Sequence, residues 1–195
     1  MLLTELRVEN FLAYHKAIEL SLAGVELACL SGPNGAGKSS LLDAVTWGLW
    51  GEARAKTDDE LLHSGTNEMS VTVRFEQDNV RYEVTRKHNR RGRNTLSLFK
   101  DTGSGKYDEP LADGIRSTQP QIDKLLKLSH KTFIHSAFLR QGQADSFTIA
   151  PPAERKRILA EILDLERWED QITKEQESPA GNPPRTLQSA AAPQN

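Results

Sequence analysis

Alternation of apolar and polar residues predicts two strands near the N-terminus of the chain. The stretch LTELRVENF alternates over residues 4–8, and KAIELSL alternates in the same way a few residues later. The next run, VELACLSG, is almost continuously apolar until Gly32, which is typical of a strand covered on both faces. This third strand would place Cys29 in a buried position.

A helix and an antiparallel meander are predicted after a glycine-rich loop. The segment KSSLLDAVTWGLWG has apolar residues at helical spacing, and Gly51 is suited to end that helix. From Glu68, the alternating stretches EMSVTVRFEQ and VRYEVTRKH flank Asp78 and Asn79, a good pair for a tight turn. A third strand, TLSLFK, follows the basic stretch RKHNRRGRN. These strands predict a meander.

The C-terminal third is predicted to be helical and then disordered. A helix is expected to begin near Pro120, and a second, short helix is expected over KTFIHSAF. Pro151 and Pro152 open a long helix that should run from about Ala153 to residue 177. The remaining residues hold four of the nine prolines and a single charge, so they are expected to be disordered. We therefore expect a lobe over residues 1–152, a helical arm over 153–177 and a tail over 178–195.

Composition narrows the class of protein. Lys and Arg number 25 against 27 Asp and Glu, a net charge of −2, which argues against a generally basic surface but leaves room for a local basic patch. Cys29 is the single cysteine, so the chain has no internal disulfide, which fits a reducing compartment. No apolar run approaches the ~20 residues of a membrane span. Charges come too early at the N-terminus for a signal peptide, so we expect a soluble cytoplasmic protein with no membrane partner.

The glycine-rich loop carries the clearest chemistry in the sequence. Residues 32–39, GPNGAGKS, fit the pattern GxxxxGK[ST] at every fixed position. Backbone N–H groups of such a loop wrap a phosphate chain, and the helix that follows adds the partial positive charge of its N-terminus. Lys38 is expected to reach the β- and γ-phosphates, and the Ser39 hydroxyl is expected to bind Mg²⁺. The predicted phosphate-binding residues are Asn34, Gly35, Ala36, Gly37, Lys38, Ser39 and Ser40.

The loop indicates a nucleoside triphosphate without saying which base it carries. GTPases that select guanine normally carry a base-reading segment of the NKxD type, and the sequence has none. ATP is therefore the favoured nucleotide, with Mg²⁺ as its metal.

Four segments in order resemble a known family. The opening LTELRVENFLAYHKAIEL, the loop GPNGAGKSSLLDAVTWGLWGEARAK, the stretch FLRQGQAD and the stretch PPAERKRILAEILDLERWED are similar to the N-terminal half of the SbcC-type ABC ATPase. That family is the large subunit of the SbcCD exonuclease complex and is close to the structural-maintenance-of-chromosomes (SMC) proteins. The resemblance implies an α/β P-loop NTPase head lobe with a mixed sheet around the P-loop helix, the meander, and the start of a coiled-coil arm.

The resemblance also implies a site residue and partners. The family's Q-loop glutamine corresponds to Gln141, which would complete the Mg²⁺ shell with Ser39 and sense the γ-phosphate. The implied partners are a C-terminal ATPase lobe or second head, a nuclease subunit and DNA ends. The implied location is the cytoplasm, in association with the nucleoid.

Several parts of the family's cycle have no counterpart in the sequence. The C-terminal half of the family supplies a Walker B aspartate with a catalytic glutamate, an LSGG-type signature and a switch histidine, and none of these is found. We therefore expect weak nucleotide binding and almost no hydrolysis by this chain alone, as for a truncated or split product. Two alternatives stay open, a remnant that binds nucleotide without turnover and another SMC-like repair ATPase of the RecF or RecN type.

Weaker signals lie in a basic stretch and around the loop. The basic residues are Arg86, Lys87, His88, Arg90, Arg91 and Arg93. They predict either a solvated hairpin tip or contacts with DNA phosphates, the latter through Arg90, Arg91 and Arg93.

Residues on either side of the predicted P-loop helix have alternative interpretations. Arg54 and Lys56 either approach phosphates or DNA or lie in a surface loop, and Tyr14 with His15 is a weaker candidate for contact with adenine. Trp47 and Trp50 are expected in the core.

Overall fold

A computed structural model describes residues 1–103, 105–107, 109–136 and 151–162 of the chain. The chain divides into two compact units, Met1–Ile149 and Ala150–Asn195. The first unit holds a β-sheet and its helices, and the second holds helix α5, Pro152–Ile162. The start of α5 agrees with the predicted helix, whereas the rest of the predicted arm and the predicted tail lie outside the described residues.

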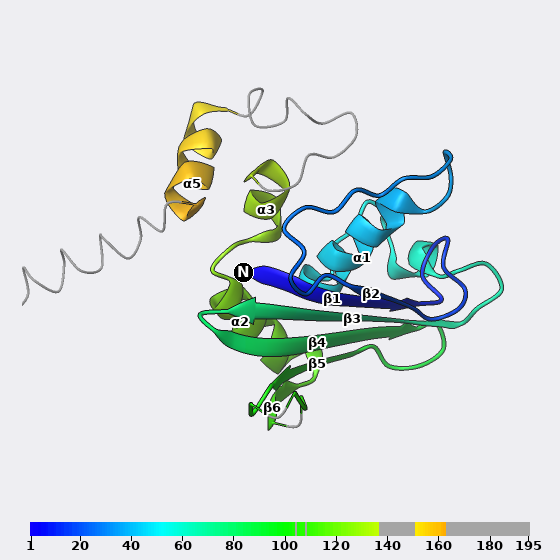
Figure 1. Ribbon diagram of the computed structural model, residues 1–195. Helices are drawn as coiled ribbons and strands as arrows, with labels where there is room; N and C mark the ends of the chain where they lie inside the picture. The colour runs from blue at the N-terminus through cyan, green and yellow to red at the C-terminus, as the bar shows by residue number, and fades with distance from the viewer. Residues whose placement is uncertain (104, 108, 137–150, 163–195) are drawn as a thin grey trace, which may run out of the picture. The chain divides into compact units, whose positions relative to one another are not determined.

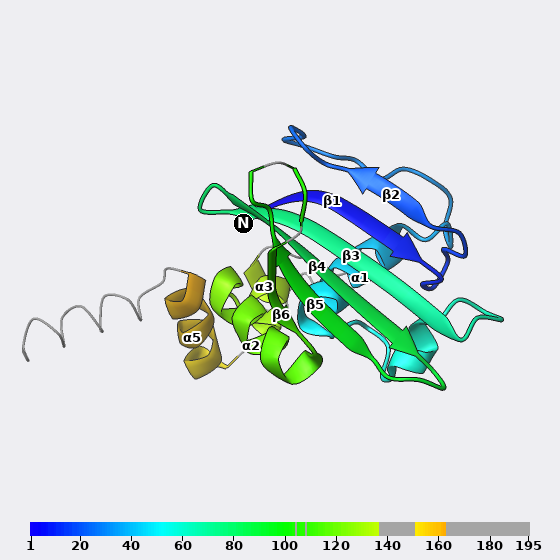
Figure 2. The ribbon, with the colours of Figure 1, turned by 90° about the horizontal axis from the view of Figure 1, so that it is seen from below.

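The first unit is built on one six-stranded sheet (Figures 1 and 2). Its strands are β1 (Leu2–Glu9), β2 (Ile18–Ser21), β3 (Glu68–Gln77), β4 (Val80–Asn89), β5 (Thr95–Lys100) and β6 (Glu109–Asp113). The spatial order is β2-β1-β3-β4-β5-β6, and every neighbouring pair is antiparallel. The predicted meander is therefore confirmed. The family resemblance implied a mixed sheet, and this is wrong for the described residues, because all of their paired strands are antiparallel.

One face of the sheet carries the core, as the alternation along the strands predicts. Val71, Val73 and Phe75 of β3 are completely buried. Helix α1, Lys38–Trp50, packs so closely on β3 that a Cβ added at Gly48 would lie 2.7 Å from Val73 Cγ2. Figure 2 shows the sheet with α1 behind it. The opposite face is polar: on it, Arg74 lies between two carboxylates of neighbouring strands.

Helices α2, Ile115–Leu126, and α3, His130–Ser136, complete the first unit. The side chain of Ile122 in α2 is fully buried in the same core cluster as that of Leu98 in β5. Helix α2 begins after Gly114, about one turn before the predicted start, so Pro120 lies inside it. The sequence predicted that Pro120 would lie in the first turn, because a proline further into a helix removes one backbone hydrogen bond. In the structure, tertiary packing of the helix offsets this loss.

The strand predicted over VELACLSG, just before the glycine-rich loop, is absent from the structure. Residues 25–30 are irregular in the structure, Leu27 is 91% exposed, and Cys29 is exposed rather than buried. The physical reason is pairing: a continuously apolar strand is stable when neighbouring strands satisfy its backbone and cover it, and no described strand pairs with this segment.

Across the part of the chain that the structure describes, no helix has the length and apolar character needed to cross a membrane.

Candidate nucleotide-binding site

The glycine-rich loop is held against the turn that follows β1. The Tyr14 hydroxyl donates a hydrogen bond of 3.1 Å to the Gly37 carbonyl, and burial raises the pKa of this tyrosine, which keeps the hydroxyl protonated. Gly37 has a φ of +94°, and a Cβ at this position would lie 2.9 Å from the Ala13 Cβ. Glycine is therefore required at position 37 for both conformation and space.

Helix α1 opens directly from this glycine, as the motif predicts. No side chain caps its N-terminus, and no acidic residue lies in its first turn. An uncapped helix N-terminus presents free N–H groups and a partial positive charge. The Gly37 carbonyl accepts from the Ser40 N–H at 2.9 Å, so Ser40 is already within the helix. This end of α1 is chemically suited to an anion.

Lys38 lies back across the loop that precedes it. Its Nζ donates hydrogen bonds to the carbonyls of Gly32, at 2.7 Å, and Pro33, at 2.8 Å. Both acceptors are neutral backbone oxygens, so the ammonium charge is not neutralised by these bonds. A phosphate near the loop would be attracted to this charge.

The loop and the helix N-terminus border a cavity of about 350 Å³. Its lining residues are Asn34, Gly35, Gly37, Lys38, Ser39, Ser40 and Arg54. A Cβ at Gly35 would meet nothing within 4 Å, so the loop is open on the cavity side or to solvent. The volume is within the usual range for small-molecule sites, and the donors fit a polyphosphate. Of the predicted loop residues, only Ala36 does not line this cavity.

The predicted metal site is described only in part. Ser39 is exposed at the cavity, where its hydroxyl could bind a cation. Gln141 lies outside the described residues, so its predicted position beside Ser39 stays a prediction.

Of the two residues of the adenine hypothesis, Tyr14 contacts the loop, and neither Tyr14 nor His15 is among the described residues that line the cavity. Tyr14 contacts Gly37 directly, and the ring of His15 stacks on that of His63, with centroids 4.9 Å apart. His63 Nδ1 also lies 2.7 Å from the Leu12 carbonyl. Contact of Tyr14 or His15 with adenine stays a prediction.

The basic stretch does not form one exposed cluster. Arg86 is buried, its Nε donates to the Gly48 carbonyl of α1 at 3.2 Å, and burial lowers its pKa to about 10. His88 is also buried. Both residues share the inward face of β4 with Val84, so the proposed cluster is wrong for these two. The period of two along β4 was the signal that could have separated them.

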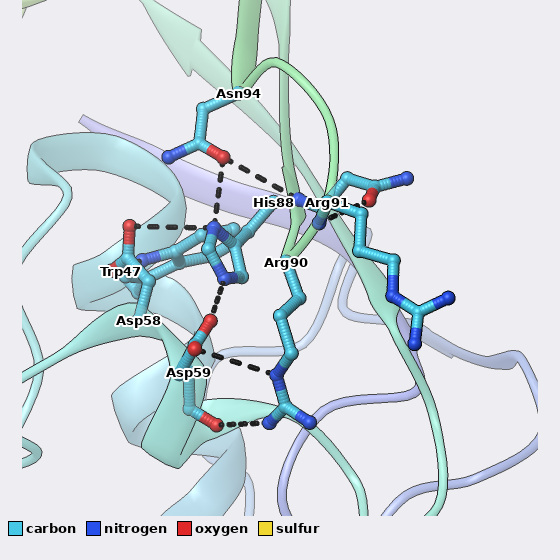
Figure 3. A network of polar contacts seen from close by, with 8 residues as sticks. Trp47, Asp58, Asp59, His88, Arg90, Arg91 and Asn94 are labelled. Carbon is cyan, nitrogen blue, oxygen red and sulfur yellow. Dashed lines mark hydrogen bonds and ion pairs between the residues drawn. The ribbon is translucent and has the colours of Figure 1, made fainter.

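A polar network joins the hairpin after β4 to the segment after α1 (Figure 3). His88 Nε2 lies 2.7 Å from Asp59 Oδ1, and His88 Nδ1 lies 2.8 Å from Asn94 Oδ1. The Arg90 Nε is 3.3 Å from Asp59 Oδ2. The hydrogen bond from His88 is the main cause that lowers the pKa of Asp59, and the Arg90 charge adds to it. Arg90 therefore has a carboxylate partner within the chain.

The other two arginines of the hairpin differ from Arg90. Arg91 and Arg93 are exposed, and within the described part of the chain neither side chain forms an ion pair. Their charges are available to an outside anion. The hypothesis of DNA contact is therefore better supported for these two residues than for Arg90.

The acidic segment after α1 is turned toward the hairpin. Asp58 and Asp59 belong to a short 3₁₀ helix, Asp58–Leu61, and Asp58 accepts a hydrogen bond of 2.9 Å from Trp47 Nε1. Trp47 is buried, as predicted, whereas Trp50 is only partly buried. Neither aspartate is among the described residues that line the phosphate-loop cavity.

Similar proteins cover most of this chain. Residues 5–190 match the AAA domain family. The chain is 30% identical over 170 residues to a DNA double-strand break repair Rad50 ATPase of Thermoplasma volcanium, covering 87% of this chain and 18% of that protein. It is 31% identical over 172 residues to the SbcC component of the nuclease SbcCD of Deinococcus radiodurans, covering 86% and 19%.

A solved structure of the recombination mediator protein RecF has a TM-score of 0.48 at 17% identity, covering 89% of this chain and 42% of that one. The chain spans about one fifth of the length of the two curated relatives. The similarity to Rad50 and SbcC confirms the resemblance found from the sequence motifs. With its glycine-rich loop at the start of α1, the chain belongs to the AAA domain family, whose P-loop ATPase domain binds nucleotide.

Proposed function

We propose that this chain is the ATP-binding N-terminal lobe of an SbcC-type ATPase that acts in the processing of DNA double-strand breaks. The observation that carries the proposal is the phosphate loop, with the uncapped N-terminus of α1 and the Lys38 ammonium at one cavity. The name of the Thermoplasma volcanium relative supports the repair role, and the name of the Deinococcus radiodurans relative supports association with a nuclease. The loop residues 34–40 would hold the phosphates of ATP.

Magnesium is proposed as the metal of this site. Ser39 and Gln141 would hold it, because a serine hydroxyl and an amide oxygen are ligands that Mg²⁺ accepts. When bound, Mg²⁺ neutralises charge on the β- and γ-phosphates. The residues of this chain bind and orient the phosphates through the loop N–H groups and Lys38.

A separate C-terminal lobe is proposed as the first partner. The apolar segment 25–30 supports this proposal, because Val25, Leu27 and Leu30 are exposed in the structure of this chain. A partner strand would satisfy the backbone of this segment and cover its side chains. The division into a lobe over 1–152, an arm base over 153–177 and a tail over 178–195 is part of the same proposal.

The further partners follow from the relatives' names and from the hairpin. A nuclease subunit and DNA ends are proposed, with Arg91 and Arg93 as DNA contacts. A cytoplasmic, nucleoid-associated location is proposed on the same basis.

A non-hydrolysing nucleotide-binding role is the second candidate for the isolated chain. It is favoured by the cavity, because no carboxylate is among the described residues that line it. A site that binds its substrate without groups that stabilise the transition state does not accelerate hydrolysis. Both candidate functions predict that the isolated chain binds nucleotide without hydrolysing it. They differ in whether addition of a C-terminal lobe produces turnover.

The test is phosphate release by the chain with and without a separately expressed C-terminal lobe that carries Walker B and the signature. We expect no turnover by the chain alone above a Lys38→Ala control, and Lys38-dependent turnover after addition of the lobe. In that complex, Gln141→Ala should lower turnover while ADP affinity persists. Lys38-dependent turnover by the isolated chain would contradict the proposal, and absence of turnover in the complex would favour the second candidate.

A further inference from the structure

Arg54 lines the phosphate-loop cavity although it lies outside the loop motif. Among the described lining residues, it alone comes from beyond residues 34–40. It belongs to the segment that follows α1, and the chain path returns it to the N-terminal part of that helix. Its Nη2 lies 3.5 Å from the Ser40 Oγ. The cavity therefore has a second cation besides Lys38.

An acidic residue of α1 anchors this arginine. Arg54 Nε lies 2.8 Å from Asp43 Oδ2, and the side chain of Asp43 is only 6% exposed. The side chain of Arg54 is 54% exposed. The shortest contact of this ion pair is made by Nε, and among the described residues Nη2 makes a long contact with the Ser40 Oγ, so the guanidinium keeps N–H donors for a ligand of the cavity that Arg54 lines. A guanidinium held in this way is oriented before any ligand arrives.

We propose that Arg54 is a second phosphate-binding residue of this site, which contacts the phosphate chain of the nucleotide through its terminal nitrogens. This inference rests on the proposed function and extends it beyond the loop motif. A triphosphate carries more negative charge than one ammonium neutralises. The planar guanidinium donates two parallel hydrogen bonds to phosphate oxygens, which a lysine cannot do.

Mg-ATP and Mg-tripolyphosphate, titrated by calorimetry into the 195-residue chain, test this inference. Tripolyphosphate has no base or ribose, so it isolates the phosphate contacts. Arg54→Ala should weaken the binding of both ligands by about 3- to 10-fold, as expected for a charge-assisted contact that is partly exposed to solvent. Arg54→Lys should recover only part of this loss, because lysine keeps the charge without the fork geometry.

Arg81 offers a closely matched control. Its side chain is 56% exposed and pairs with Asp101, whose side chain is 4% exposed, at 3.8 Å. Arg81→Ala removes the same charge from the same kind of ion pair on β4, outside the lining of the cavity, and should leave both affinities unchanged. Thermal unfolding of each variant would identify any loss of fold, and Arg54→Lys, which keeps a positive charge beside Asp43, gives a second measurement.

Each outcome has one meaning. Equal affinities for wild type and Arg54→Ala, or a loss for Mg-ATP without a loss for tripolyphosphate, would overturn the role of Arg54 and leave the proposed function standing. An equal loss in Arg81→Ala would also overturn it, because the effect would then be one of overall charge. If the wild-type chain bound neither ligand, the proposed function itself would fail, and this inference with it.

Discussion

At the scale of single residues, Gly37 and Tyr14 determine the position of the phosphate loop. Gly37 is left-handed and lies so close to Ala13 that no side chain fits, and its carbonyl accepts the Tyr14 hydroxyl. The loop is therefore fixed by a turn that lies 23 residues earlier in the chain. The motif names the residues of the loop, but the residues that support it belong to another part of the fold.

Cys29 gives a residue-scale test of the segment before the loop. Because this single cysteine is exposed in the irregular stretch 25–30, it should react with a thiol reagent almost as fast as it does in the unfolded chain. The measurement is the rate of labelling by a chromogenic disulfide with and without denaturant. Addition of the proposed C-terminal lobe should slow the native rate at least about tenfold, as burial excludes the reagent.

A slow native rate without the lobe would contradict the exposed segment. It would instead restore the prediction of a buried strand. A Cys29→Ser variant gives the background of the assay, since no other cysteine is present.

At the scale of elements, the hairpin between β4 and β5 separates charges that look alike in the sequence. Arg86 and His88 lie on the inward face of β4, where they contact α1 and the 3₁₀ helix. Arg90 pairs with Asp59, whereas Arg91 and Arg93 are exposed on the loop. Of the three loop arginines, Arg91 and Arg93 are the two that form no ion pair with the described residues, so they offer full charges to a phosphate backbone.

Salt dependence of DNA binding distinguishes these arginines. Arg91→Ala and Arg93→Ala should each lower the affinity for duplex DNA and reduce the slope of log K against log salt by about one, as expected when one phosphate contact is lost. Arg90→Ala should change the slope less, because Asp59 already neutralises part of its charge. The measurement is a fluorescence-anisotropy titration at several salt concentrations.

Arg81→Ala, on β4 but away from the hairpin loop, is the control for loss of one positive charge. Equal slopes for wild type and for both Arg91 and Arg93 variants would leave the hairpin as a solvated turn.

The sequence pattern was sufficient to predict the elements whose formation depends on residues close together in the chain. Alternation predicted β1, β2, β3, β4 and β5, and the motif predicted the loop and the start of α1 at Lys38. Residues 25–30 were mispredicted because a strand needs partners, and the apolar run does not say which strands supply them. Arg54 was left between two interpretations because its return to Ser40 depends on the path of the chain after α1.

At the scale of the whole molecule, the proposed function makes the site one surface of a larger assembly. The chain spans about one fifth of its curated relatives, and its cavity offers phosphate-binding groups without a described carboxylate. Binding and hydrolysis are therefore separable properties. The phosphate loop should bind nucleotide in this chain, whereas turnover should depend on a partner.

Calorimetric titration of Mg-ATP into the wild-type chain and into Lys38→Ala tests this central claim most directly. Lys38 provides the ammonium at the loop, so its loss should weaken binding at least about tenfold, as for a charged hydrogen bond to phosphate. The exposed Lys124 on α2 lies outside the cavity lining, and Lys124→Ala should leave the affinity unchanged. Equal affinity of Lys38→Ala and wild type for Mg-ATP would contradict the assignment of residues 32–40 as the nucleotide-binding loop.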